Sequence, residues 1–140
     1  MAAVKGTNVA GLDAMPRVMP DADQWHGRLR VQRDTYEASA LTIGSTIDVA
    51  VIQPNSRIHN VLVKHDALGA SSTLAVGDAA DDDRFVTAQA TASAGAFNLW
   101  DDGVIDNIGH RYDVETRIKL KTAGAAITGT IVTEVWYAND

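Results

Sequence analysis

The chain has 140 residues and carries 18 acidic against 12 basic side chains, a formal net charge of −6. This balance excludes a typical nucleic-acid binder or a protein that docks on anionic membranes, because both need clustered lysine and arginine. There is no cysteine, so disulfide scaffolds, zinc–thiolate sites and cysteine nucleophiles are also excluded.

The length fits a single domain, in which apolar residues make up 46%. Because much of that share is alanine, we expect a thin core whose stability is completed by oligomerisation. No apolar run approaches the roughly 20 residues that span a bilayer. The N-terminus also lacks the apolar core of a secretion signal. We therefore expect the protein to be made and assembled in the cytoplasm.

Residues 1–24 show neither helical nor strand periodicity, and Pro16 and Pro20 bias the residues before them toward extended geometry. Apolar side chains are scattered through the segment as they are not in a typical polar tail: Val9, Leu12, Met15, Val18 and Met19. A disordered tail and an extended arm lying on a neighbouring subunit are both consistent with this pattern. We expect an extended N-terminal arm over residues 1–24 and a β domain over residues 25–140.

A period-two pattern begins after the arm and predicts short strands through the rest of the chain. The first strand is expected at residues 28–35, where Leu29, Val31 and Thr35 share one face. Polar side chains occupy the other face, so this strand is predicted to turn its apolar face to the core.

The second strand is expected at residues 45–52, with Ile47, Val49 and Val51 on one face. A turn at residues 53–56 contains Pro54, Asn55 and Ser56, which are favoured in turns. The third strand follows directly at residues 57–65.

Two further strands are expected at residues 73–76 and 84–88, joined by an acidic loop. Residues 88–94 have only small or polar side chains and fit either one helical turn or a loop. Residues 97–100 fit a short strand that ends at residues 101–103, Asp-Asp-Gly, a strong turn signal.

The clearest strand is residues 113–121, where charged side chains alternate with a face of Val114, Thr116, Ile118 and Leu120. The last strand, residues 127–137, is apolar on both faces and is predicted to lie at the sheet centre or in a subunit interface. Seven to nine short strands at roughly ten-residue spacing predict a β-sandwich or barrel.

No pattern in the chain predicts a catalytic, cofactor-binding or metal-binding residue. The acidic loop, with Asp78 and residues 81–83, lacks the ligand spacing of a calcium loop and is predicted to be a solvated turn, with a shared divalent ion as the alternative. His59 and His65 lie about 20 Å apart along one strand, too far to share a metal. Nucleophile-elbow and phosphate-loop spacings are absent from the sequence. We expect the chain not to be an enzyme.

The tryptophans and tyrosines are dispersed singly, which favours packing in the core or an interface over a sugar-binding platform. Trp25 and Trp136 are the anchors we expect at an interface, because tryptophan is enriched among the residues that dominate binding energy.

The runs Leu62–Gly69 and Thr73–Asp81, followed by Asp83-Arg84-Phe85, resemble a recurring segment of small structural proteins of tailed bacteriophage virions. The resemblance covers about residues 43–138, within the predicted β domain, and does not include the arm. It implies an all-β fold, an antiparallel jelly-roll-like β-sandwich, and a subunit that is often trimeric.

The function implied by the resemblance is that of a capsid decoration, or cement, protein on the outer face of the head. Its partners would be the major capsid protein and two further copies of itself in a homotrimer, with no nucleic acid, membrane or cofactor. The chain would then reside on the capsid surface of the virion. The alternatives are another virion component, such as a head-fibre base, neck or tail protein, and a carbohydrate-binding β-sandwich.

Overall fold

A computed structural model describes residues 2–5, 7–22, 24–25 and 27–139. Within these ranges, no helix has both the length and the apolar character needed to cross a bilayer. The elements in chain order are α1 (Thr7–Leu12), β1 (Leu29–Leu41), β2 (Thr46–Ile52), β3 (Ser56–His65), β4 (Thr73–Gly77), β5 (Val86–Ala90), β6 (Gly95–Asn98), α2 (Leu99–Asp102), the 3₁₀ turn η1 (Ile105–Asn107), β7 (Arg111–Tyr112), β8 (Thr116–Ala123) and β9 (Ile127–Asn139).

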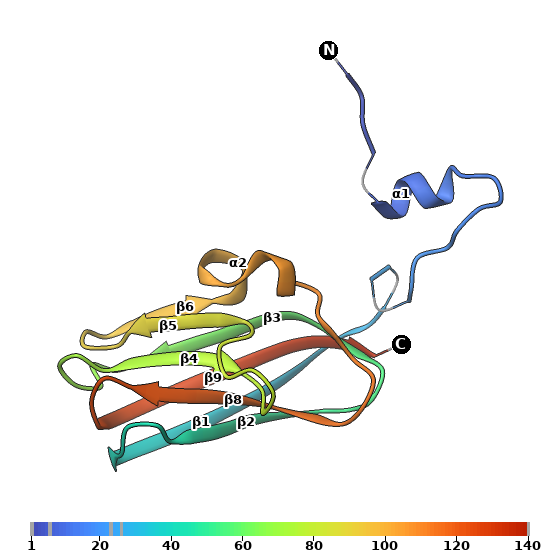
Figure 1. The fold of residues 1–140 in the computed structure, drawn as a ribbon. Coiled ribbons are helices and arrows are strands. Elements are labelled where there is room, and N and C mark those ends of the chain that lie inside the picture. Colours follow the sequence, from blue (N-terminus) through green and yellow to red (C-terminus); the bar gives the residue numbers. More distant parts are fainter. Residues whose placement is uncertain (1, 6, 23, 26, 140) are drawn as a thin grey trace.

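The strands form two antiparallel sheets packed face to face (Figure 1). One sheet has the order β1-β9-β3-β6, with the short β7 also pairing with β3, and the other has the order β2-β8-β4-β5. Strands β1 and β2, which are adjacent in sequence, lie in different sheets, as do β3 and β4. This order is that of a jelly roll, two interlocked Greek keys. The predicted all-β, jelly-roll-like sandwich is therefore confirmed.

The core lies between the two sheets and is built from the inward side chains of both. Ile118 and Leu120 of β8 are fully buried, as their alternation with charged residues predicts. Val135 of β9 and Phe85, just before β5, are also fully buried. Each large apolar side chain buried in this way stabilises the fold by about 1.5–3 kcal/mol.

Strand β9 lies between β1 and β3 and pairs with both over most of its length. Its residues of one parity, such as Ile131 and Val135, are buried in the core, while Val132 and Trp136 of the other parity are partly exposed on the outer side. The prediction that it lies at the sheet centre is confirmed.

The predicted inward face of β1 is wrong. Leu29 and Val31 are 50% and 52% exposed, whereas Gln32 and Tyr36 of the opposite parity point toward the other sheet. Gln32 faces inward because its amide donates to the Val51 carbonyl at 2.6 Å and accepts from the Val51 N–H at 3.0 Å. This side chain thereby ties the edge of one sheet to the edge of the other.

The predicted face of β2 is correct only in its first half. A bulge between Asp48 and Ala50 shifts the pairing with β8 by one residue. After the bulge Ile52 points into the core and Val51 points outward, 40% exposed. Val114, expected in the β8 strand, precedes it and is 68% exposed.

Residues expected as a short strand at 97–100 instead divide between β6 and α2. Asn98 ends the strand and caps the helix, since its side chain accepts a hydrogen bond from the Asp101 N–H. The cap turns the chain into a single helical turn, which places Leu99 in the core and leaves Trp100 62% exposed.

The segment that precedes β1 projects away from the sandwich (Figure 1). It is not extended throughout, as the sequence analysis expected, because α1 forms one short helix in it. The chain then folds back, and the Val18 N–H donates to the Gly11 carbonyl at 2.8 Å. Gly11 lets the two segments approach closely, since an added Cβ would lie 3.1 Å from the Val18 carbonyl oxygen.

Candidate interaction surfaces

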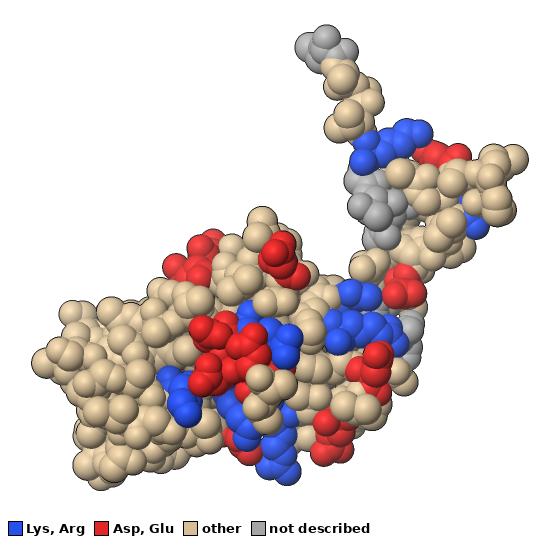
Figure 2. Space-filling view, viewed as in Figure 1, with Lys and Arg blue, Asp and Glu red and all other residues tan. Residues whose placement is uncertain are grey.

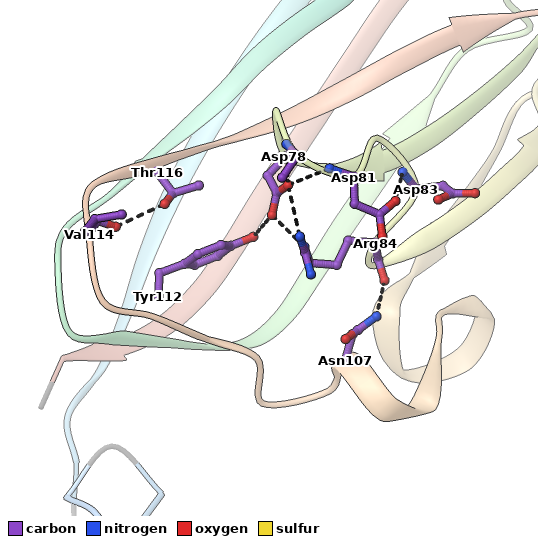
Figure 3. Close-up of polar contacts among 9 residues, drawn as sticks. Asp78, Asp81, Asp83, Arg84, Asn107, Tyr112, Val114 and Thr116 are labelled. Carbon is purple, nitrogen blue, oxygen red and sulfur yellow. Dashed lines mark hydrogen bonds and ion pairs between the residues drawn. The ribbon is translucent and has the colours of Figure 1, made fainter.

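The acidic loop between β4 and β5 is organised by the carboxylate of Asp78 (Figure 3). Asp78 is 4% exposed and accepts hydrogen bonds from the backbone N–H groups of Ala80 and Asp81 at 3.0 and 2.9 Å. The Arg84 guanidinium donates to it at 2.7 Å and the Tyr112 hydroxyl at 2.5 Å. The prediction of a wholly solvated turn is therefore wrong for Asp78, which closes the loop from inside.

Gly77 makes this closure possible, because a Cβ at that position would lie 2.1 Å from the Asp81 carbonyl oxygen. On the far side of the loop, the Arg84 carbonyl accepts a hydrogen bond from Asn107 at 2.7 Å, and Phe85 enters the core. The run of residues 77–85, on which the resemblance to phage proteins partly rests, is therefore a structural motif.

The ionisable groups of this network shift one another's pKa. Burial acts to raise the pKa of Asp78, but hydrogen bonds from Arg84 and Tyr112 outweigh it, and the pKa lies below its ordinary value. Burial and the Asp78 carboxylate raise the pKa of the Tyr112 hydroxyl. The hydrogen bond to Asp78 likewise raises the pKa of Arg84.

The other three carboxylates of the loop, Asp81, Asp82 and Asp83, are exposed and have oxygens within 4.8 Å of one another. The hydrogen bond between Asp83 and Asp81 raises the pKa of Asp83. Because Asp78 already has four donors, the loop offers a cation only these exposed oxygens.

A hollow of about 520 Å³ lies beside the loop, between it and β8. Its basic side chains are already paired: Arg84 with Asp78, and both Arg117 and Lys119 with Asp48, at 3.2 and 2.6 Å. The charged groups around the hollow therefore stabilise one another and fix the outer face of the four-stranded sheet.

The histidines in the described part of the chain do not converge. His65 is buried and tilted against Phe97, while the ring of His110 lies 4.7 Å from that of Tyr112. His59 lies at a bulge of β3, and His26 is outside the described residues.

The arm residues expected at an interface are largely exposed on the projecting segment. The exposed fractions are 41% for Val9, 95% for Met15, 61% for Val18 and 67% for Met19, and Leu12 is partly exposed. The base of the arm is held to the body by an ion pair of 3.3 Å between Asp21 and Arg57.

The two tryptophans expected as anchors lie apart from this apolar group. Trp25 is partly exposed near the base of the arm. Trp136 is on β9, on the outer face of the five-stranded sheet, and its indole N–H donates to Glu134 at 3.0 Å.

The exposure of the apolar residues Leu29, Val31 and Trp100 was not predicted from the sequence. The first two were assigned to the core because their parity is apolar. Trp100 was assigned to a strand, although Asn98 followed three residues later by Asp101 is a recognisable helix-start signal. The indole N–H of Trp100 donates to the His59 carbonyl at 2.6 Å, which fixes the ring at the sheet edge.

The charged side chains are unevenly distributed over the surface. Figure 2 shows them gathered around the acidic loop and toward the base of the arm, while the opposite end of the sandwich is free of charge in this view. The loops at that end contain no charged residue; they are residues 39–45, 67–73, 88–96 and 122–129. The two ends of the molecule therefore differ: the arm projects from one end, and the loops at the opposite end are uncharged.

No protein-family model and no curated protein matches the chain. A chain of the cyanophage Pam1 capsid superposes with a TM-score of 0.66 and 19% identity, covering 100% of both chains. A chain of the Ralstonia phage GP4 capsid gives a TM-score of 0.64 and 17% identity, over 88% of this chain and 90% of that one. The chain shares its fold with phage capsid chains.

A third match extends this likeness. A chain of the Helicobacter pylori bacteriophage KHP30 capsid gives a TM-score of 0.59 and 8% identity, over 79% of this chain and 86% of that one. At these identities the likeness concerns the fold, and at that level it confirms the predicted resemblance to phage structural proteins. The Pam1 match also spans the arm, which lay outside the resemblance found in the sequence.

Proposed function

We propose that the chain is a capsid decoration, or cement, protein of a tailed phage. It binds the outer face of the head through its arm and stabilises contacts between major capsid protein subunits. It acts as a homotrimer, and this role requires no catalytic residue, cofactor, nucleic acid or membrane.

The observation that carries the proposal is a projecting apolar arm on a jelly roll that shares its fold with phage capsid chains. A stable domain gains nothing from exposing Met15, Val18 and Met19 to water, and such apolar patches mark binding surfaces.

The physical logic of such a protein is selective binding. A ligand that binds the assembled shell and not its free subunits stabilises the shell by mass action. Several modest contacts made by one oligomer add through multivalency. An arm suits this task because it can cover a large surface, although ordering it on the shell costs conformational entropy.

The test is the number of copies per virion, measured by quantitative mass spectrometry on particles of the phage that encodes the chain. Hundreds of copies, in a simple ratio to the major capsid protein, are expected. A dozen copies or fewer would contradict a shell-wide role and indicate a head-fibre base, neck or tail protein. Absence from the particle would refute any virion role and make glycan binding the next hypothesis to test.

A further inference from the structure

The outer face of the five-stranded sheet, here called the outer sheet face, is formed by the outward side chains of β1, β9, β3 and β6. The register defines it: Val31 lies opposite Trp136, and Trp136 lies opposite Asn60. The next rows place Leu62 beside Glu134, and Val132 beside Lys64. This face is the far side of the molecule from the acidic loop.

Apolar groups are prominent on the outer sheet face. Leu29 and Val31 are about half exposed, and Trp136, Val132 and Leu62 are partly exposed. A groove of about 480 Å³ runs over Leu62 and Val132. Sheets of this kind usually alternate apolar residues inside with polar residues outside, and here that rule fails on the outer side.

The charge of the outer sheet face sets it apart from the rest of the chain. Its outward strand positions beyond the arm base carry two positive and two negative side chains: Arg33, Lys64, Glu37 and Glu134. The adjoining Arg57 is paired with Asp21 of the arm. In a chain of net charge −6, the outward strand positions of this face carry no net charge, and one further carboxylate, Asp66, adjoins them just after β3.

Neutrality matters most for contact with an identical molecule. Copies related by a rotation axis bring equivalent residues close together, so any excess of one charge near the axis repels itself. A face with both signs in equal number avoids this repulsion. Arg33 and Glu134 already pair with each other within the chain, so neither adds an uncompensated charge to the contact.

The size of the face suffices for a stable contact. Strand β3 has 10 residues, and at about 3.3 Å per residue and 4.8 Å between strands, the face has a planar area of about 500 Å². A standard interface buries about 800 Å² of accessible surface per partner. The accessible surface of a face with projecting side chains exceeds its planar area, so the two quantities are comparable.

We infer that copies of this chain associate with one another through the outer sheet face, with Val31, Val132 and Trp136 among the apolar side chains of the contact. This inference deepens the proposed function by assigning a surface to self-association. The arm remains free to bind the shell.

The test compares Val31→Arg with Val114→Arg in the full-length chain. Both valines are exposed, at 52% and 68%, but only Val31 lies on the outer sheet face. Sedimentation equilibrium should give an oligomer for the unchanged chain and for Val114→Arg. Association should weaken at least tenfold for Val31→Arg, because the arginine would place an unpaired charge in an apolar part of the contact.

A second variant, Trp136→Ala, should weaken association similarly, and circular dichroism should show that every variant is folded. A monomeric unchanged chain, or folded Val31→Arg and Trp136→Ala variants that associate normally, would refute the inference. The measurement needs no capsid. A chain that associates through this face yet is absent from virions would refute the proposed function and leave this inference intact.

Discussion

The carboxylate of Asp78 joins three parts of the chain: the backbone of its own loop, Arg84 and Tyr112. Arg84 is six residues away, and its pairing with Asp78 is within reach of sequence reasoning. Tyr112 is 34 residues away and arrives through β7, whose place depends on the register of β3. Sequence alone therefore identified the loop but not the buried role of its first aspartate.

Replacing Asp78 by alanine should lower the free energy of unfolding by about 3 kcal/mol. The change leaves Arg84 and Tyr112 without their acceptor and removes the cap of the loop. Urea denaturation measures the effect, and Asp82→Ala, which removes an exposed carboxylate, is the control and should shift stability by less than about 0.5 kcal/mol. Equal effects of the two substitutions would contradict the role assigned to Asp78.

At the scale of elements, the alternation of apolar and polar residues correctly predicted strands in which one face is solvated and charged. It located β8 and its buried Ile118 and Leu120. It failed for β1, where Gln32 faces inward and makes two hydrogen bonds to the backbone of a strand of the other sheet. The alternation of apolar and polar residues along one strand cannot reveal such a contact, because the partner strand is distant in sequence.

The same limit applies to the bulge in β2 and to the helices. One inserted residue at residues 48–50 reverses the parity of everything after it, and nothing in the local sequence requires the insertion. α1 and α2 have six and four residues, too few for helical periodicity to be detectable. Of the two helices, only α2 had a local sign of its start in the sequence, the N-cap residue Asn98.

Deleting residues 1–20 should leave the sandwich folded and abolish binding to capsids. The strands and their core lie wholly outside the deleted segment, and the ion pair of Asp21 with Arg57 is kept. Thermal melting followed by circular dichroism tests the fold, and co-sedimentation with capsids that lack the protein tests binding.

The matched control replaces Lys5 and Asp13, which pair with each other at 2.6 Å, by serine in the full-length chain. If the apolar side chains of the arm make the contact, this control should bind nearly as well as the unchanged chain. Full binding by the truncated chain would show that the arm is not the attachment element.

At the scale of the whole molecule, stability should fall in two stages on acidification. Burial, and next the positive charge of Arg84, lower the pKa of His110, with Asp78 opposing and Arg57 adding to the effect. The unfolded chain therefore takes up a proton below about pH 6.5 while the folded chain does not, and the free energy of unfolding decreases. The pKa of Asp78 is also lowered, so its contribution is complete above about pH 3.9 and is lost below it.

Urea denaturation midpoints between pH 8 and pH 3 test this profile. The first stage should be less steep than about 1.4 kcal/mol per pH unit, the limit for a single proton. His110→Gln should remove the first stage and retain the second. An unchanged first stage in that variant would mean that another group titrates there.

Both ends of the described chain leave the sandwich on one side, where Leu29 pairs with Ala138. The loop around Ser93 lies at the other end and is exposed (Figure 1). This arrangement decides where a foreign sequence can be attached when the protein is used as a display scaffold. A peptide inserted after Ser93 would be presented away from the arm, whereas a tag fused to the C-terminus would compete for the space beside it.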